Sequence, residues 1–212
     1  MEVIILAGGQ GSRMETALPK ALVEINQKPI IAYQLDFLLN SGIVNKVVLA
    51  LGYEAEKIKD YVLNKYPKAN IVFSIETQPL GTAGALKQAM AQCLEDFTLI
   101  LNCDDITDID LELLQQGEND QICVAHPELP FGLVKEADGY AVFEEKPRLK
   151  EWVSCGWYYL EKNNLNQLLP GQGSLEYDVF PSLKLLLFKH EGFWQPLNTP
   201  KDIKNFEAKT KK

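Results

Sequence analysis

A glycine-rich loop with two basic residues follows the first run of branched apolar residues in the chain. Its sequence is LAGGQGSRMETALPK. Gly8, Gly9 and Gly11 leave the loop without side chains, so backbone N–H groups can converge on an anion or approach a flat base. Arg13 adds a planar fork suited to phosphate oxygens, and Lys20 adds a compact positive charge. This combination predicts a site for a polyphosphate.

Three simpler explanations of the loop fit less well. A tight turn with solvated charges accounts for the glycines but gives no reason for basic residues on both sides of a structured Leu18-Pro19 pair. A dinucleotide-binding fingerprint needs a third glycine near Met14 and a helix that starts within the loop, where Pro19 stands instead. A Walker A loop needs Gly-Lys-Ser or Gly-Lys-Thr, which is absent.

A second cluster of reactive side chains lies in the stretch LILNCDDITDID, where four aspartates follow an apolar run. Carboxylate oxygens at the carboxyl end of a strand suit Mg²⁺ when its other ligands are substrate phosphates and waters. Asp110 is better placed to cap the following helix. Asp105 and Asp108 are either solvated or support a metal ligand without contacting the metal themselves. Asp104 is the fourth aspartate of this cluster.

The elements that must position these residues alternate in type along the first hundred residues. Short β-branched runs are typical of strands buried on both faces of a parallel sheet, and helical patterns lie between them. Thr82 is expected to be the N-cap of the third helix. The alternation predicts a doubly wound α/β fold. The expected strands are 3–6, 47–50, 71–75 and 99–101, and the expected helices are 29–39, 54–66 and 82–94.

The second half of the chain has a more mixed pattern. Only its Lys-rich end, residues 208–212, is expected to be a flexible tail, which leaves one catalytic domain over residues 1–207. The expected strands are 122–125, 132–134, 140–145 and 155–160, and segments 165–169 and 177–187 are expected to be partly helical.

Composition limits the class of protein. The chain has 212 residues, of which 46% are hydrophobic, enough to bury one sizeable core. A formal net charge of −8 argues against a broad surface for nucleic acid or an anionic membrane. The N-terminal apolar run lacks the length and basic flank of a secretory signal, and no run reaches the ~18 apolar residues of a membrane span. These features predict a soluble, cytoplasmic protein.

The cysteines and histidines indicate neither a zinc site nor a disulfide framework. No two cysteines have CxxC spacing, and the two histidines, His126 and His190, form no zinc-ligand pattern with them. The cysteines are expected to be reduced thiols, as is typical of cytosolic proteins. The four residues are Cys93, Cys103, Cys123 and Cys155.

The motif LAGGQGSRM, followed by LPKALVEINQKPI, resembles the signature of the sugar-1-phosphate nucleotidyltransferases, also called nucleotide-sugar pyrophosphorylases. The resemblance continues in order through ETQPLGTAGAL, NCDD, FEEKP and GFWQPLNTP, across nearly the whole chain. It implies a Rossmann-like α/β fold with a mixed, mostly parallel central sheet flanked by helices. It also implies Mg²⁺ as cofactor, with a nucleoside triphosphate (NTP) and a sugar 1-phosphate as substrates.

The resemblance implies a role for individual residues. The glycine loop would contact base and ribose, and the segment after residue 76 would meet the nucleobase edge. The lysine of FEEKP would grip the sugar phosphate. The implied nucleotide-binding residues are Leu6, Ala7, Gly8, Gly9, Gly11, Gln78 and Gly81; the catalytic ones are Arg13, Lys20 and Lys146; the sugar-phosphate-binding ones are Gly132, Glu145, Lys146 and Ser154; the metal ligands are Asp104 and Asn198.

Several positions depart from the family pattern. Cys103 stands where the family has the glycine of NGD, and Ser154 stands where an asparagine contacts sugar. Pro196 replaces a metal-binding aspartate, so the implied second ligand is Asn198, two residues later. An amide oxygen is a weaker Mg²⁺ ligand than a carboxylate, which predicts looser metal binding. Glu176 either touches sugar or caps a helix.

The predicted reaction gives a nucleotide-sugar and pyrophosphate. One alternative is a cytidylyltransferase for a phosphorylated alcohol such as phosphocholine, because the first motif also fits that group. A second, of another class, is a nucleotide-binding or regulatory homologue without catalysis, suggested by the departures at Cys103, Ser154 and Pro196. The identity of the base and the sugar stays open, and a homo-oligomer is among the allowed states.

Overall fold

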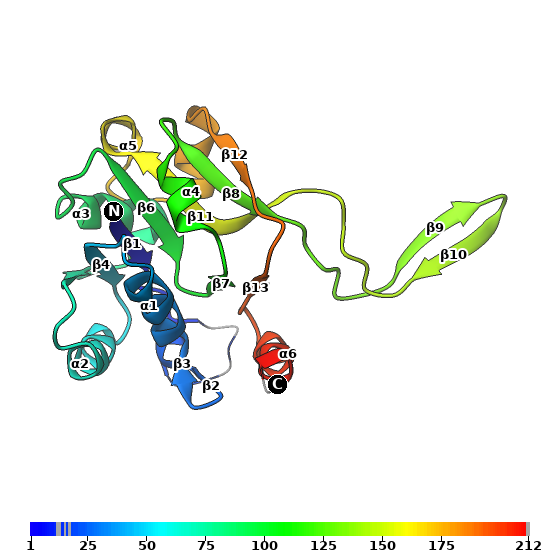
Figure 1. The fold of residues 1–212 in the computed structure, drawn as a ribbon, viewed down its shortest axis with the longest axis horizontal. Helices are drawn as coiled ribbons and strands as arrows, with labels where there is room; N and C mark the ends of the chain where they lie inside the picture. Colours follow the sequence, from blue (N-terminus) through cyan, green and yellow to red (C-terminus); the bar gives the residue numbers. More distant parts are fainter. Residues whose placement is uncertain (12–13, 15, 17, 211–212) are drawn as a thin grey trace.

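A computed structural model describes residues 1–11, 14, 16 and 18–210. Its centre is a seven-stranded sheet in which, among the described strands, only β11 runs against the others (Figure 1). The expected mixed, mostly parallel α/β sheet is therefore confirmed. In order across the sheet the strands are β12 (Leu186–Lys189), β8 (Gln121–Ala125), β11 (Val153–Glu161), β6 (Phe97–Asn102), β1 (Glu2–Leu6), β4 (Lys46–Leu51) and β5 (Ile71–Ile75).

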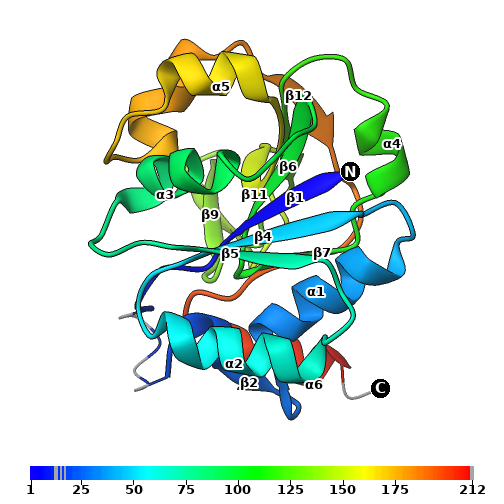
Figure 2. The ribbon, with the colours of Figure 1, turned by 90° about the vertical axis from the view of Figure 1, so that its left-hand side faces the viewer.

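Helices cover both faces of the sheet (Figure 2). One face packs against α3 (Gly81–Met90) and α5 (Lys162–Leu168). The other face packs against α1 (Ile30–Asn40), α2 (Ala55–Lys65) and α4 (Leu111–Gln115). A sixth helix, α6 (Pro200–Thr210), lies beside α1, where the rings of Tyr33 and Phe206 meet edge to face with centroids 5.5 Å apart.

The first strand shows why the sheet is buried on both faces. Val3 and Ile5 point into the core beneath α1 and α2, whereas Ile4 points into the core beneath α3 and α5. All three side chains are fully buried. A continuous apolar run is therefore required, because alternate side chains of a strand point to opposite faces.

Shorter elements complete the body. Asp110 caps α4 as expected, since its carboxylate accepts a hydrogen bond from the Leu113 N–H at 2.9 Å. Residues 177–187 are partly helical as expected, because helical turns end at Ser182 and β12 begins at Leu186. The additional elements are η2 (Lys20–Leu22), β2 (Glu24–Ile25), β3 (Lys28–Pro29), β7 (Asp105–Thr107), η3 (Leu175–Val179), η4 (Phe180–Ser182) and β13 (Trp194–Pro196).

The C-terminal helix extends into the segment that the sequence pattern assigned to a tail. Residues 208–210 belong to α6, so the chain stays helical past the expected boundary at residue 207. Phe206 is buried against the main core and anchors this last segment. Within the described part of the chain, no helix has both the length and the apolar character needed to cross a membrane.

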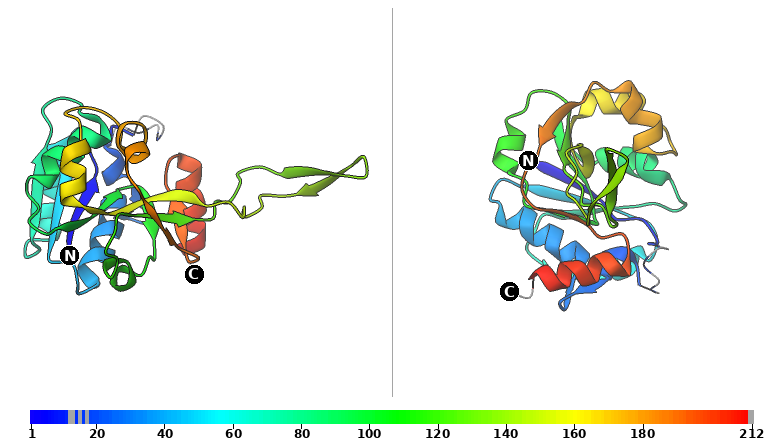
Figure 3. Two further views of the ribbon diagram at one scale, coloured as in Figure 1. Left: turned by 90° about the horizontal axis from the view of Figure 1, so that it is seen from above. Right: turned by 90° about the vertical axis from the view of Figure 1, so that its right-hand side faces the viewer.

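A hairpin projects far from the body between β8 and β11. Its strands are β9 (Leu133–Ala137) and β10 (Tyr140–Glu144), paired antiparallel around a turn at Asp138-Gly139 (Figures 1 and 3). Residues 126–152, which comprise the hairpin and the two segments that join it to the body, are called the arm below. The two strands were expected from the sequence, but their separation from the sheet was not.

Candidate active site

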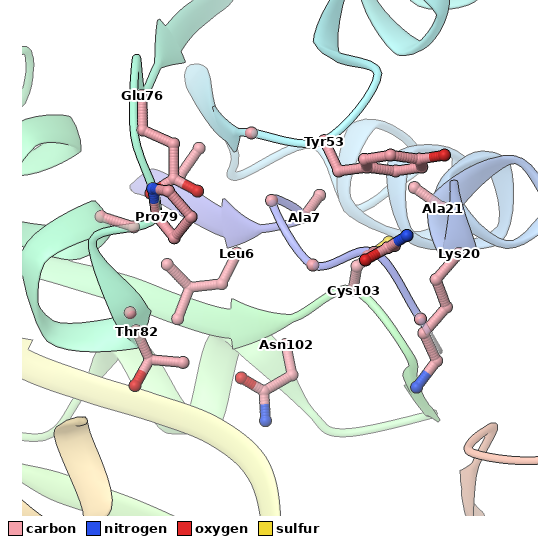
Figure 4. Close-up of a pocket in the computed structure, with 18 of the residues that line it drawn as sticks. Leu6, Ala7, Lys20, Ala21, Tyr53, Glu76, Pro79, Thr82, Asn102 and Cys103 are labelled. Atoms are coloured by element: carbon pink, nitrogen blue, oxygen red, sulfur yellow. The ribbon is translucent and has the colours of Figure 1, made fainter. Parts of the chain in front are cut away.

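A cavity of about 950 Å³ opens at the edge of the sheet where β1, β4 and β6 end (Figure 4). Because these strands are parallel, their carboxyl ends meet at one edge, which is where α/β sheets bind ligands. The structure brings many of the predicted site residues together here. Those that line the cavity are Leu6, Ala7, Gly8, Gly9, Gly11, Lys20, Gln78, Gly81, Asp104 and Asn198.

The glycine loop continues β1 into the cavity as exposed backbone. The Gly8 carbonyl accepts a hydrogen bond from the Tyr53 N–H at 3.0 Å, which ties the loop to the end of β4. At Gly9, a Cβ atom would have nothing within 4 Å. The loop therefore offers open space and backbone groups at this point, as a nucleotide site needs.

Gly11 is required by the position of Lys20. The Gly11 backbone has φ +68°, which disfavours other residues, and a Cβ there would lie 2.7 Å from the Lys20 Cβ. Lys20 itself begins η2, which is closed by a hydrogen bond from the Val23 N–H to the Lys20 carbonyl at 3.2 Å. The glycine thus lets the lysine stem pass close to the loop and reach into the cavity.

Lys20, Asp104 and Asn198 meet although they are far apart in the sequence. The Lys20 ammonium forms an ion pair with the Asp104 carboxylate and donates to the Asn198 Oδ1 at 3.1 Å. The Lys20 and Asp104 side chains are only 17% and 22% exposed. A carboxylate oxygen and an amide oxygen therefore converge on one positive charge at the cavity wall.

Two local structures hold Asn198 beside Asp104. β13 pairs with β7, and the Leu197 N–H donates to the Asp104 carbonyl at 2.9 Å. Next along the chain, the Asp202 carboxylate accepts from the Asn198 N–H at 3.0 Å and from the Thr199 N–H at 2.8 Å. Thr199 and Asp202 have the spacing of a capping box, so the start of α6 fixes the loop that carries Asn198.

Asp105 is buried, which corrects the expectation that it could be solvated. Its side chain accepts hydrogen bonds from the Trp194 indole at 3.0 Å and from the Asn102 amide at 3.3 Å. Burial, reinforced by the neighbouring Asp104 charge, raises the pKa of Asp105 to about 7. A Cβ at Gly156 would lie 2.0 Å from the Asp105 Oδ2, so only glycine fits there.

The far wall is formed by the segment between β5 and α3 (Figure 4). The Glu76 carboxylate accepts from the Leu80 N–H at 3.0 Å and shapes this turn. Thr82 is not the N-cap of α3, because the helix begins at Gly81. Instead the Thr82 hydroxyl accepts from the Leu175 N–H at 2.9 Å and faces the Glu176 carboxylate at 3.5 Å. These contacts join the start of α3 to η3 at the cavity wall.

Comparison with known proteins identifies the family of this site. The family model for nucleotidyl transferases matches residues 2–180. The chain belongs to the nucleotidyl transferase family. The glycine loop, the NCDD segment and the β5–α3 turn all lie within the matched range, and together they line the cavity.

Two curated relatives within the family are guanylyltransferases. The mannose-1-phosphate guanyltransferase of Gibberella zeae is 33% identical over 96% of this chain, which spans only 62% of that relative's length. The D-glycero-alpha-D-manno-heptose 1-phosphate guanylyltransferase of Campylobacter jejuni is 30% identical, and the alignment includes 97% of this chain and 98% of that relative's length.

A solved structure of HddC from Yersinia pseudotuberculosis, complexed with GMP-PN, has a TM-score of 0.80 and 25% identity over 99% of both chains. The inositol-1-phosphate CTP transferase of T. maritima, with a TM-score of 0.73 and 15% identity, shares the fold.

Not every predicted residue reaches the cavity. Gly132, Glu145 and Lys146 lie on the arm and do not line it, and the Lys146 and Glu145 side chains are 58% and 59% exposed. Ser154 is at the start of β11, where its hydroxyl lies 3.2 Å from that of Tyr158, outside the cavity lining. Arg13 lies outside the described residues.

Cys103 stands where the family pattern has the glycine of NGD, and it does not block the cavity. It is 6% exposed and packs into the main core, while its carbonyl accepts from the Gln34 amide at 3.0 Å. Burial, together with the Asp104 charge, raises the pKa of the Cys103 thiol. A small apolar thiol at this point is therefore compatible with the same backbone path toward Asp104.

Some cavity residues were not predicted. Asn102, Tyr53, Glu76 and Thr82 line it together with Glu176, whose role was left open. Asn102 was detectable, since it precedes the aspartates at the end of a buried strand. Glu76 begins the ETQPLGTAGAL motif, but no role was assigned to it. Tyr53 gave no local signal, because it reaches the cavity only through the pairing of β4 with its neighbours.

The described lining of the cavity is rich in acids. The described lining has one basic residue, Lys20. Its acidic residues are Glu76, Asp104, Asp105 and Glu176. Within the described residues, no group of three or more His, Cys, Asp or Glu side chains is placed to hold a metal ion. Two oxygens on one ammonium are the partial ligand set expected when substrate phosphates and waters supply the rest.

Proposed function

We propose that this nucleotidyltransferase transfers a nucleotidyl group from an NTP to a sugar 1-phosphate, with Mg²⁺ as cofactor. An oxygen of the sugar phosphate forms a bond to the α-phosphorus of the NTP. The bond from the α-phosphorus to the oxygen that bridges it to the β-phosphorus breaks, and pyrophosphate leaves with that electron pair. The attacking oxygen is already anionic, so no side chain has to remove a proton.

The observation that carries this proposal is the convergence of Lys20, Asp104 and Asn198 at the end of the glycine loop. Two polyanions must meet on a protein of net charge −8, and two charges ~4 Å apart repel by about 4 kcal/mol at an effective dielectric near 20. Local cations must offset this repulsion. Arg13 and Lys20 are proposed to neutralise charge on the triphosphate.

Asp104 and Asn198 are the residues that would hold Mg²⁺, because their oxygens already share one cation. The metal would polarise the phosphates and neutralise charge in the transition state. The backbone of Leu6, Ala7 and Gly8 is proposed to orient the base and ribose with Gln78 and Gly81, and Gly9 and Gly11 to leave room for the phosphates. Positioning and charge stabilisation then supply most of the rate.

The names of the relatives support GTP as the donor and a hexose or heptose 1-phosphate of manno configuration as the acceptor. The cytoplasm is the proposed location, supported by four buried cysteines that form no disulfide in the described chain.

The decisive experiment is a grid of the four NTPs against several sugar 1-phosphates, read by pyrophosphate release with and without Mg²⁺. We expect the highest activity with GTP and a manno-configured sugar phosphate, and none without metal. Phosphocholine with CTP is included as the alternative acceptor. Release only with that pair would replace the sugar by a phosphorylated alcohol, and no release with any pair would favour a non-catalytic homologue.

A further inference from the structure

Asp105 is a buried carboxylate that the proposed reaction does not use. It borders the cavity, but its side chain is held by two fixed donors, the Trp194 indole at 3.0 Å and the Asn102 amide at 3.3 Å. Only 9% of the residue is exposed. Burying a carboxylate costs free energy unless hydrogen bonds offset it, and an apolar residue would fill the same space at lower cost. The value of Asp105 therefore lies in the elements that its hydrogen bonds join.

The neighbouring strand β11 is shaped around this carboxylate. At Gly156 a Cβ atom would collide with the Asp105 Oδ2, and the glycine has φ +75°, which other residues rarely adopt. The register of β11 on β8 shifts between Ser154 and Tyr158, so this irregularity spans the glycine. Next to it, the Trp157 indole donates to the Asp105 backbone carbonyl at 2.9 Å. The sheet thus holds Asp105 in one position.

Asp105 also begins β7, which forms a short two-stranded ribbon with β13 (Figure 1). The register places Trp194 opposite Thr107 and Pro196 opposite Asp105. The Trp194 indole therefore reaches diagonally across the ribbon, as long side chains on paired strands can. A two-stranded ribbon is marginally stable through its backbone alone. The hydrogen bond from Trp194 to Asp105 ties β13 to a residue that the sheet holds in place.

The two proposed metal ligands stand at one end of this ribbon. Asp104 directly precedes β7, Asn198 follows β13 by two residues, and the Leu197 N–H donates to the Asp104 carbonyl at 2.9 Å. The register of β13 on β7 therefore sets where Asn198 lies relative to Asp104. A slip of one residue would move Asn198 by about 3.3 Å and turn Trp194 to the other face of the ribbon. The hydrogen bond from Trp194 to Asp105 is incompatible with such a slip.

We propose that Asp105 and Trp194 are positioning residues, because their hydrogen bond fixes the register of β13 on β7 and so holds the Asn198 oxygen beside the Asp104 carboxylate. These two oxygens are the ones that share the Lys20 ammonium. Replacing a residue that orients a metal ligand commonly weakens metal binding by roughly 10–100-fold. The consequence for Mg²⁺ rests on the proposed function, but the register of the ribbon does not.

The register is tested by amide hydrogen exchange, measured for individual residues by NMR. Trp194→Phe keeps an aromatic ring and removes the N–H donor. We expect the Leu197 amide, which donates across the ribbon, to exchange about 10-fold faster relative to the amides of β1, as for the loss of one buried hydrogen bond. An unchanged relative rate at Leu197 would overturn the proposal.

Gln195→Ala is the matched control in the same strand. The Gln195 side chain makes its hydrogen bonds with Pro196 and Lys209 in the described structure, and none of them reaches Asp105. This variant should leave the relative exchange rate of the Leu197 amide as in the wild type. An acceleration equal to that of Trp194→Phe would mean that any change in β13 loosens the ribbon, which would contradict the role assigned to Trp194.

Two variants of Asp105 separate its hydrogen bond from its charge. Asp105→Asn keeps an oxygen for the indole, so the Leu197 amide should stay protected to within about threefold of wild type. Asp105→Leu keeps the branched shape but removes the acceptor, so it should accelerate exchange as Trp194→Phe does. Loss of protection in Asp105→Asn, or full protection in Asp105→Leu, would contradict the proposal.

The effect on the ligands is tested by a Mg²⁺ titration of pyrophosphate release. Trp194→Phe should raise the Mg²⁺ concentration for half-maximal activity by about 10-fold. The KM for the NTP at saturating Mg²⁺ should stay within about twofold, because the glycine loop is unchanged. A less stable variant with the wild-type Mg²⁺ requirement would show a structural role only and overturn the positioning role. A wild type without activity toward any substrate pair would reject the proposed function, and the exchange rates would still decide the register.

Discussion

The two ends of β1 carry similar charged residues that act differently. At the amino end Glu2 is 4% exposed, and its carboxylate accepts from the Leu94 and Glu95 N–H groups and from the Lys46 ammonium at 3.2 Å. Two backbone N–H groups and one lysine hold this carboxylate in the fold. Such a carboxylate stabilises the fold and has nothing left to offer a ligand.

At the carboxyl end the Asp104 side chain is 22% exposed and borders the cavity. Its side-chain partner in the described structure is the ammonium of Lys20, which also donates to Asn198. A lysine can swing away when a substrate or metal arrives, whereas backbone groups cannot. The comparison teaches that a buried charge at a sheet edge is structural when the backbone satisfies it, and available for chemistry when a side chain does.

The largest effect is expected from Asp104→Asn. This change removes the carboxylate charge at the cavity, so kcat should fall by about 10²–10³-fold, the cost of losing one electrostatic stabiliser of a transition state. The free energy of unfolding should change by less than ~1 kcal/mol, as for a partly exposed ion pair. Pyrophosphate release and chemical denaturation measure the two quantities, and near-normal turnover would remove Asp104 from the mechanism.

An intermediate effect is expected from Glu2→Gln, which removes the same charge at the opposite edge. A neutral amide would turn an N–H₂ group toward either the backbone donors or Lys46, so the unfolding free energy should fall by about 1–3 kcal/mol. The kcat at saturating substrate should stay within twofold of wild type. A variant of wild-type stability with impaired turnover would invert the comparison.

The same carboxylate predicts a pH dependence. Burial alone would raise the pKa of Glu2, but hydrogen bonds from Glu95, Leu94 and Lys46 hold the pKa below the ordinary glutamate value of 4.5. Because the folded state has the lower pKa, the stabilisation is present above pH 4.5 and is lost as the pH falls through the folded pKa. The stability gap between wild type and Glu2→Gln should therefore narrow below that pH.

The sequence was sufficient to predict the body and its glycine loop. Continuous apolar runs fix buried parallel strands, and a loop at the end of β1 must lie at the edge where β6 delivers Asp104. It could not separate Asp104 from Asp105, because the burial of Asp105 depends on Trp194, which follows it by 89 residues. The sequence also missed α6, although Thr199 and Asp202 have the spacing of a capping box.

The arm shows a different limit. Apolar and polar residues alternate enough along its strands for the strands to be predicted. A hairpin pattern, however, indicates only that the apolar side chains pack against some other surface. Whether that surface belongs to the same chain or to another depends on contacts between chains, which single-sequence patterning does not contain. Glu145 and Lys146 were therefore predicted as site residues with no indication that they stand outside the cavity of their own chain.

The smallest effect is expected from Asn198→Asp, which adds a negative charge to the cavity at the carboxyl end of β1. A carboxylate is a stronger ligand for Mg²⁺ than an amide, so the Mg²⁺ concentration for half-maximal activity should fall by about 3–10-fold while kcat changes little. The measurement is a Mg²⁺ titration of pyrophosphate release at fixed substrates. Complete loss of activity would count against Asn198 as a ligand.

Asn45→Asp provides the control for that titration, because Asn45 lies at the opposite edge of the sheet, near the amino end of β1. The Asn45 amide donates to the Glu95 carboxylate at 2.7 Å, so this variant adds the same charge beside a carboxylate that Met1 and the backbone already engage. It should cost stability through like-charge repulsion and leave the Mg²⁺ requirement unchanged. An equal shift in both variants would mean that total charge, rather than a ligand at the cavity, sets the metal dependence, and the functional distinction between the two edges would fail.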